Sequence, residues 1–119
     1  MNTDVRQLVT RSGQHEWLPL VEPGVNTKGI FVKVLRYDEQ MQRAPVFLLK
    51  FDAGASYPFH DHPAGEEAFV LEGEVAFEGE VLSAGDYLLT PPGGRHGVRS
   101  ERGCVVLFIV PQEVEILPE

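Results

Sequence analysis

The stretch GASYPFHDHPAGEEAFVLEG, residues 54–73, decides the interpretation of this 119-residue chain. It contains His60 and His62, which on an extended strand point to the same face, about 6.6–6.8 Å apart along the chain. Glu66 comes four residues later, after a Pro-Ala-Gly segment suited to turning the chain back. Two imidazoles in this arrangement can converge on one ion, at about 2.0–2.1 Å from each nitrogen.

A second stretch, GDYLLTPPGGRH at residues 85–96, supplies a third imidazole. His96 follows a turn rich in proline and glycine, which would fix its approach from another strand. A lone His-x-His pair is more often a surface feature, but the complete set with its glycines favours a metal site. The predicted ligands of one divalent ion (Fe, Mn, Ni or Zn) per chain are His60, His62, Glu66 and His96.

Other polar side chains near these stretches have alternative interpretations. Glu67 is the rival ligand to Glu66, but it points to the opposite side if the segment is extended. Tyr57, Arg95 and Arg99 lie near the predicted mouth of the site and could orient an anionic substrate, although solvated surface positions suit the two arginines better. Cys104 opens an apolar segment, which favours a buried, inert thiol over a reactive one.

Charge and composition exclude several classes of protein. The chain has 10 Lys and Arg against 18 Asp and Glu, a net charge of −8, which disfavours nucleic acid and anionic membranes as partners. A single cysteine excludes an intramolecular disulfide. Residues 1–11 lack the apolar core of a secretory signal, and the longest apolar run, 104–110, is too short to span a bilayer. We therefore expect a cytoplasmic protein.

Nine prolines and 12 glycines divide the chain into short segments rich in Val, Leu, Phe and Ile, which is typical of an all-β fold. No long amphipathic helix intervenes, so a sandwich or barrel is favoured over βαβ units, and 5–11 is a short helix or an irregular arm. The predicted strands are 29–37, 46–52, 57–61, 67–72, 74–77, 86–90 and 103–110. A chain of this length buries roughly two-thirds of its unfolded surface, so the fold does not need the ion.

Two of these segments, 46–49 and 104–110, are apolar at every position, which predicts that both of their faces are buried. A single barrel wall does not bury both faces. The outer face would be covered by an N-terminal segment or by a second subunit, and we predict a homodimer.

The two motifs together resemble the cupin family. The first motif runs from Gly54 through the histidine pair and Glu66 to Gly73, and the second runs from Gly85 to His96. The asparagine that often follows the second motif is replaced by Ser100, which affects a supporting hydrogen bond and not a metal ligand. The resemblance implies a single-domain double-stranded β-helix, or jelly-roll barrel, over residues 1–119. Its barrel core would lie at about 44–111, with an N-terminal arm and strands in 1–43.

Within that family, HPAGEE at 62–67 followed by VLEG at 70–73 resembles a narrower subgroup. It includes the zinc-binding cupin domain of anti-sigma factors and small dioxygenases that cleave diketones or hydroxyacetophenone. The resemblance implies a non-haem metal-dependent dioxygenase acting on a small oxygenated compound in the barrel, such as a diketone or hydroxyketone. The alternatives are a non-catalytic metal-binding sensor or regulatory cupin and a metal-free cupin of the sugar epimerase or isomerase kind.

Coordination number separates the first two functions. Three neutral imidazoles and one carboxylate leave a divalent site with a net charge of about +1, suited to an anionic oxygen ligand. A six-coordinate Fe, Mn or Ni ion keeps two positions open for substrate or dioxygen. A tetrahedral zinc ion would be closed by the same four ligands and serve a structural or sensory role.

Overall fold

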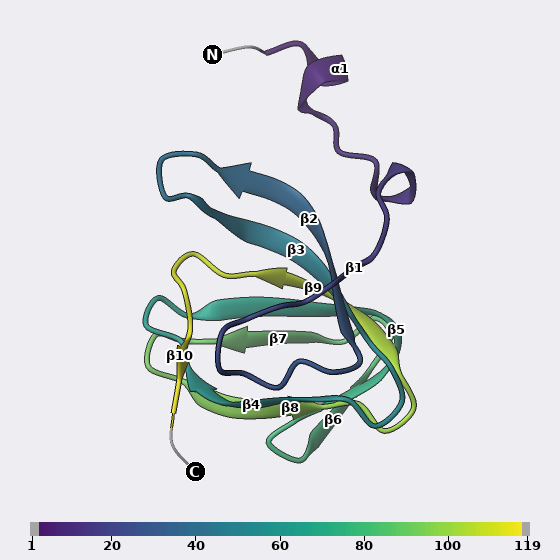
Figure 1. Cartoon of the computed structure of the whole chain (residues 1–119), viewed down its shortest axis with the longest axis vertical. Coiled ribbons are helices and arrows are strands. Elements are labelled where there is room, and N and C mark those ends of the chain that lie inside the picture. Colours follow the sequence, from purple (N-terminus) through teal and green to yellow (C-terminus); the bar gives the residue numbers. More distant parts are fainter. Residues whose placement is uncertain (1–2, 118–119) are drawn as a thin grey trace.

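In the computed structural model, which describes residues 3–117, the strands form one curled sheet with the order β1-β2-β3-β9-β5-β8-β4-β10 (Figure 1). Two further strands, β6 and β7, pair with β5. The elements are α1 (Val5–Leu8), η1 (Ser12–Gln14), β1 (Leu18–Pro19), β2 (Ile30–Asp38), β3 (Arg43–Phe51), β4 (Ser56–Asp61), β5 (Glu66–Phe77), β6 (Glu80–Ser83), β7 (Tyr87–Thr90), β8 (Arg95–Arg99), β9 (Cys104–Ile109) and β10 (Glu115–Ile116). This architecture confirms the predicted all-β jelly-roll fold.

The longest strand, β5, joins the two halves of the barrel. Its first half pairs with β7 and β9, and its second half pairs with β6 and β8. The sequence analysis divided it at Gly73 into two strands, but Gly73 stays in the ladder opposite Cys104. Gly73 has φ of 75°, and a Cβ there would overlap the carbonyl of Gly103. Only glycine permits this close approach of two strands.

The barrel interior is filled by alternate residues of the strands, as expected for a sheet with one face on the core. In β9 the even-numbered positions are buried and the odd-numbered positions are only half-buried. The prediction that both faces of this segment are buried is therefore not met within a single chain. The core consists of Ile30, Leu49, Phe51, Ala55, Tyr57, Ala68, Val70, Val75, Phe77, Leu82, Val98, Cys104, Val106, Phe108 and Val110.

Strands β6 and β8 were absent from the sequence prediction. In β8 the inward positions are His96 and Val98, so the segment lacks the apolar alternation by which strands are recognised. It is held in place by β4, in an antiparallel ladder that sets His96 directly opposite His60. This segment looks unlike a strand because of His96, and His96 is the residue that β8 places in the barrel interior.

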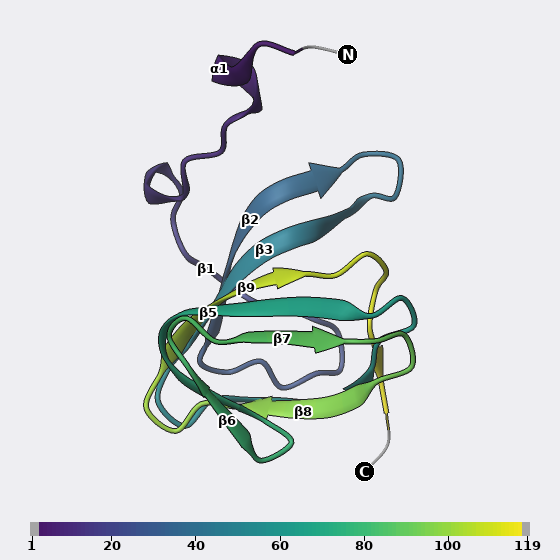
Figure 2. The ribbon, with the colours of Figure 1, turned by 180° about the vertical axis from the view of Figure 1, so that it is seen from behind.

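The N-terminal segment extends away from the barrel as an arm (Figures 1 and 2). The predicted helix or irregular arm at 5–11 contains one helical turn, Val5–Leu8. The arm is tied to β2 because Thr10 Oγ1 donates to the carbonyl of Leu35 at 2.9 Å and Lys33 Nζ donates to that of Ser12 at 2.9 Å. Within residues 3–117, none of the helical segments has the length and hydrophobicity to cross a membrane.

Candidate metal centre

The four predicted ligands meet inside the barrel although they come from three separate segments. His60 lies in β4 and His62 directly follows it, His96 lies in β8, and Glu66 opens β5. One ligand atom from each residue lies within 4.8 Å of the others. All four side chains are buried, with His62 fully inaccessible. The structure therefore brings together the four residues that the sequence analysis predicted as metal ligands.

Two turns dock on each other and hold the histidines in place. The carbonyl of His62 accepts hydrogen bonds from the amides of Gly65 at 3.0 Å and Gly93 at 2.9 Å, and the amide of His62 donates to the carbonyl of Gly94 at 3.1 Å. Gly65 has φ of 80°, and a Cβ there would lie 2.8 Å from the carbonyl oxygen of Thr90. This close contact explains why the turn between His62 and Glu66 contains glycine.

Backbone carbonyls fix the orientation of two imidazoles. His60 Nδ1 lies 2.8 Å from the carbonyl of Pro58, and His62 Nδ1 lies 2.7 Å from that of Gly94. A carbonyl only accepts, so each Nδ1 carries the proton and each Nε2 presents its lone pair. This tautomer, set by a hydrogen bond to the second ring nitrogen, is typical of metal-binding histidines.

Three buried atoms at the centre lack hydrogen-bond partners. His62 Nε2 and His96 Nε2 lie 3.2 and 3.3 Å from Glu66 Oε2, yet none of the three makes a hydrogen bond of acceptable geometry. Leaving buried polar atoms unsatisfied is costly, on the order of 1–3 kcal/mol each. A divalent cation that accepts lone pairs from both nitrogens and the carboxylate oxygen would remove this cost. The donor set and its unsatisfied atoms fit a metal ion.

The titration behaviour of these groups is consistent with that fit. Burial is the main reason that the pKa of His60 falls to about 4, so its ring is neutral at pH 7. Burial alone would lower the pKa of His62 and raise the pKa of Glu66, but the two side chains lie next to each other. The carboxylate therefore raises the pKa of His62, and the imidazoles lower the pKa of Glu66. The carboxylate thus attracts positive charge into the centre, which is the place a cation would occupy.

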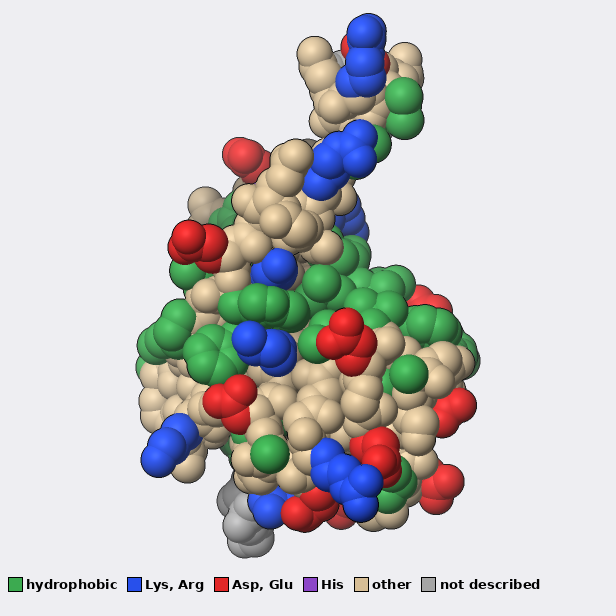
Figure 3. Space-filling model, turned by 90° about the vertical axis from the view of Figure 1, so that its right-hand side faces the viewer, with side chains coloured by type: hydrophobic (Ala, Val, Ile, Leu, Met, Phe, Trp, Pro, Cys, Tyr) green, Lys and Arg blue, Asp and Glu red, His purple; other side chains and the backbone are tan. Residues whose placement is uncertain are grey.

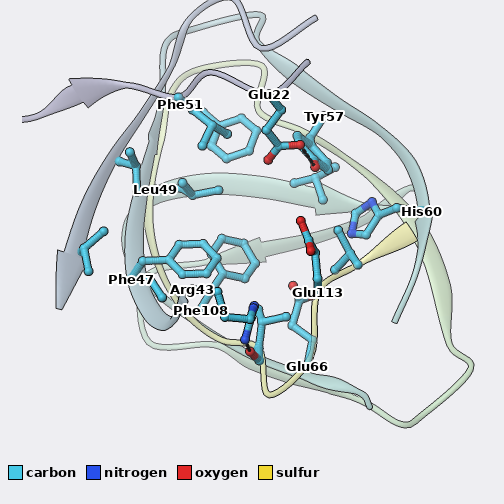
Figure 4. Close-up of a pocket in the computed structure, with 17 residues that line it drawn as sticks. Glu22, Arg43, Phe47, Leu49, Phe51, Tyr57, His60, Glu66, Phe108 and Glu113 are labelled. Atoms are coloured by element: carbon cyan, nitrogen blue, oxygen red, sulfur yellow. Dashed lines mark hydrogen bonds between the residues drawn. The ribbon is translucent and has the colours of Figure 1, made fainter. Parts of the chain in front are cut away.

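A cavity of about 320 Å³ adjoins the four side chains, and both His60 and Glu66 line it (Figure 4). Its remaining lining is mostly apolar and comes from β2, β3, β4, β8 and β9, from the loop after β1 and from the loop before β10. The other lining residues are Leu20, Glu22, Val32, Val34, Arg43, Ala44, Phe47, Leu49, Phe51, Tyr57, Val98, Phe108, Val110, Glu113 and Val114. A small molecule in this cavity would lie directly against the cluster.

Four polar side chains line the cavity outside the ligand set. The hydroxyl of Tyr57 donates to Glu22 at 2.5 Å, and Arg43 Nη1 donates to the carbonyl of Val110 at 2.6 Å. Glu113 lies between them in Figure 4. Burial and the Glu22 carboxylate raise the pKa of Tyr57, so the phenol remains a donor. Of these four, sequence analysis identified only Tyr57, because Glu22, Arg43 and Glu113 lie outside both motifs.

The rival candidates lie elsewhere. Glu67 is on the outer face of β5 and accepts a hydrogen bond from Tyr87 at 2.6 Å, which agrees with the preference for Glu66. Arg95 pairs with Asp61 at 3.7 Å, and both Arg95 and Arg99 are exposed outside the cavity, as expected.

Two further residues bear on details of the sequence analysis. Ser100 Oγ donates to the carbonyl of Glu74 at 2.6 Å and accepts from the amide of Gly103 at 2.9 Å. The serine therefore supplies supporting hydrogen bonds in place of the usual asparagine. Cys104 is buried, and burial raises the pKa of its thiol.

The jelly-roll barrel and its internal cluster of three histidines and a glutamate define a protein of the cupin class. A family model for the ChrR cupin-like domain matches residues 5–114, and the chain belongs to this family. The match includes the arm, both motifs and the last loop.

One curated relative is the dimethylsulfoniopropionate lyase DddQ of Ruegeria pomeroyi. It is 36% identical over 78 residues, which cover 60% of this chain and 39% of the relative. The match thus spans about two-fifths of the length of that protein.

Two solved structures illustrate the fold. An acetylacetone dioxygenase from Acinetobacter johnsonii superimposes with a TM-score of 0.75 at 16% identity, covering 87% of this chain and 72% of that one. The polyketide cyclase RemF from Streptomyces resistomycificus has a TM-score of 0.73 at 19% identity, covering 92% and 84%. At these identities the likeness establishes the shared fold.

Proposed function

We propose that this chain is a metal-dependent enzyme that binds a small oxygenated compound in its barrel cavity by carbonyl or carboxylate oxygens. One observation supports this most directly: His60 and Glu66 belong both to the ligand cluster and to the cavity wall. A purely structural zinc site needs no such cavity. Because the ligand cluster and the cavity wall share these two residues, we favour a site in which the bound compound contacts the ion.

The ion would be held by His60, His62, Glu66 and His96. Bound there, a divalent metal supplies Lewis-acid polarisation of an oxygen ligand. The residues around it have separate tasks. The carbonyls of Pro58 and Gly94 keep two imidazoles in one tautomer, and the apolar walls exclude water from the bound compound.

Oxidative cleavage of a diketone or hydroxyketone is the leading reaction. Dioxygen is the oxidant, and both of its atoms enter the carbonyl fragments. The acetylacetone dioxygenase of Acinetobacter johnsonii shares the fold, and the sequence motifs resemble the dioxygenase subgroup. A dioxygen-independent elimination is the second candidate, because the matched relative from Ruegeria pomeroyi is a lyase.

Metal content and turnover together test this proposal. Protein purified without chelator is expected to carry close to one Fe, Mn, Ni or Zn ion per chain. Oxygen uptake is then followed with Fe(II)-loaded protein over a panel of diketones and hydroxyketones, and product formation is followed under argon for the elimination. Much less than one ion per chain, with a melting temperature unchanged by Fe(II) or Zn(II), contradicts the metal centre.

Neighbouring glutamates provide a matched pair of variants. Glu66→Gln removes the carboxylate that faces the cluster, whereas Glu67→Gln makes the same change on the outer face of β5. We expect loss of bound metal and of turnover in the first variant only. Equal metal content in both variants would contradict the assignment of Glu66.

A sensor or regulatory module is the alternative from another class, and the family's name connects it with ChrR. Under that alternative, the protein holds its ion but turns over nothing. Co-purification of a sigma factor or other regulator with tagged protein, together with flat oxygen and elimination assays, would favour it over the enzyme.

We also propose a homodimer formed through the outer face of β5, β7 and β9. Leu71, Tyr87 and Leu89 expose 42%, 53% and 61% of their surface there, and contiguous exposed apolar side chains mark interaction sites. Figure 3 shows hydrophobic side chains gathered in a band below the N-terminal arm on one side of the molecule. Light scattering at micromolar concentration is expected to give the mass of two chains, and a monomeric mass contradicts the proposal.

A further inference from the structure

Two lysines lie on the outer face of β2 and β3. Val32, Leu49 and Phe51 line the cavity, and successive side chains of a strand point to opposite faces. Lys33 and Lys50, each next to one of these residues, therefore point outward. Both lysines are half-buried, and within residues 3–117 neither forms an ion pair.

Aromatic rings surround these two ammonium groups in place of carboxylates. Lys33 Nζ lies 4.8 Å from the centroid of the Trp17 ring, and Lys50 Nζ lies 5.2 Å from the same centroid. Lys50 Nζ also lies 5.1 Å from the centroid of the Phe31 ring. Lys33 uses one of its three N–H groups on the carbonyl of Ser12. Contact with a ring leaves the charge of an ammonium group uncompensated, so both remain available to a carboxylate from another molecule.

Two glutamates occupy the other side of the same face, beyond β9. Glu67 lies on the outer face of β5, and Glu72 is the partner of Val105 in the ladder between β5 and β9. Lys50 is the partner of Val105 in the ladder between β3 and β9. Directly opposed residues of a sheet point to the same face, so Lys50, Val105 and Glu72 form one row across it. Neither glutamate forms an ion pair within the described residues 3–117.

Apolar side chains separate the basic side of this face from its acidic side. The outward residues of β9 are Val105, Leu107 and Ile109, which are half-buried. On β5, Phe69 and Leu71 expose 38% and 42% of their surface. In Figure 3, basic and acidic side chains lie at different places along the hydrophobic band. The face thus runs from lysines on β2 and β3, through an apolar centre on β9, to glutamates on β5.

This order of charges distinguishes two ways in which two copies can pack face to face. A two-fold axis parallel to β9 sets β3 of one copy over β5 of its partner, so that lysines face glutamates. A two-fold axis across the strands sets β3 over β3 and β5 over β5, so that like charges face one another. Each chain carries a net charge of −8, so two copies repel overall, and contacts between like charges would add to that repulsion. The charge pattern favours the first arrangement.

We propose that a second copy of this chain covers the outer face with the two-fold axis parallel to β9, so that Lys50 of each copy pairs with the partner's Glu72. Lys33 then lies on the side that faces the partner's Glu67. This inference rests on the homodimer of the proposed function. It adds the arrangement of the two chains and the residues that select it.

Charge reversal at the two ends of the row tests this arrangement. Lys50→Glu and Glu72→Lys each set like charges opposite one another twice in the dimer, and we expect each change to raise the dimer dissociation constant by about 100-fold. Sedimentation equilibrium measures this constant. Lys28→Glu, the same reversal in the exposed loop before β2, is the control and is expected to leave the constant unchanged. Single variants that dimerise like wild type overturn the arrangement, because the axis across the strands predicts no such loss.

Restoration of the dimer provides the second part of the test. When the Lys50→Glu and Glu72→Lys chains are mixed, each reversed position meets an opposite charge in the other chain. We expect the mixture, and the double variant Lys50→Glu/Glu72→Lys alone, to dimerise with about the wild-type constant. Failure of the mixture or of the double variant to regain the dimer overturns the pairing of these residues.

A milder change covers the case in which a reversed chain does not fold, which far-UV circular dichroism and metal content detect. Lys50→Met keeps an unbranched side chain between the Trp17 and Phe31 rings and removes the charge. We expect it to raise the dimer dissociation constant by about tenfold. An unchanged constant in this variant overturns the proposal.

The wild-type chain separates failure of the homodimer from failure of this arrangement. A monomeric wild type at micromolar concentration overturns the homodimer and the arrangement with it. A dimeric wild type whose reversed variants keep the same constant overturns only the arrangement. Metal content should be equal in all of these proteins, because Lys50 and Glu72 are not members of the ligand cluster.

Discussion

The two walls of the cavity have opposite chemistry. The aromatic wall, formed by Phe47, Phe51 and Phe108 on β3 and β9, is complete by itself, with the rings of Phe47 and Phe108 stacked at 5.8 Å. The histidine wall, which reaches the cavity through His60 and Glu66 and continues behind them to His62 and His96, contains buried atoms without partners. The first wall contributes stability through packing. The second has the features of a site that is completed by a ligand, and four variants or conditions can separate these two roles.

The largest expected effect on stability comes from the aromatic wall. Phe108→Ala removes a ring that is 3% exposed, and we expect the free energy of unfolding to fall by about 3 kcal/mol. Urea denaturation of metal-free protein measures this change. The folded variant is expected to retain its metal content, and a loss of metal would show that the two walls are not separable.

The histidine wall is tested by His62→Gln, which keeps much of the side-chain volume but removes the Nε2 lone pair. We expect metal affinity to fall by more than about 100-fold, since even substitutions outside the ligand set cost 10- to 100-fold. Competition against a chromophoric chelator measures the affinity. Wild-type metal affinity in this variant would contradict the role of His62 as a ligand and the distinction between the two walls.

Adding the ion to wild-type protein should stabilise the fold through the histidine wall. At a free metal concentration one hundred times the dissociation constant, we expect a gain of about 2.7 kcal/mol. Calorimetry should show a rise in melting temperature on the order of 10 °C, reversed by chelator. The His62→Gln variant serves as the control, and an equal rise in that variant would indicate binding elsewhere.

The smallest effect is expected where the walls meet the loops. Tyr57→Phe removes the hydroxyl that donates to Glu22, which should lower the free energy of unfolding by about 1 kcal/mol. Metal content should be unchanged, because Tyr57 is not a member of the ligand cluster. Coincident denaturation curves for variant and wild type would show that this bond does not stabilise the protein.

The outcome for individual elements shows what local sequence conveys. The β3 and β9 segments were predicted because their apolar residues are consecutive, whereas β8 was missed because one of its two inward residues is His96. Gly73 looked like a strand end since glycine usually interrupts strands, yet it permits the contact with Gly103. Local sequence was sufficient to predict the strands that bury apolar side chains. It was insufficient where an inward-facing histidine or a close contact between two strands took the place of an apolar side chain.

The sequence by itself indicated the all-β class, because prolines and glycines divide it into short apolar segments. It also indicated the four candidate metal ligands and the preference for Glu66 over Glu67, because the residue spacing in two short motifs favours these side chains sharing a face. Only the tertiary structure decided that the four ligand atoms lie within 4.8 Å of one another and that Nε2 of His62, Nε2 of His96 and Oε2 of Glu66 lack partners. It alone placed Glu22, Arg43 and Glu113 around the cavity. These residues are distant along the chain, and long-range strand pairing, which local sequence does not encode, brings them together.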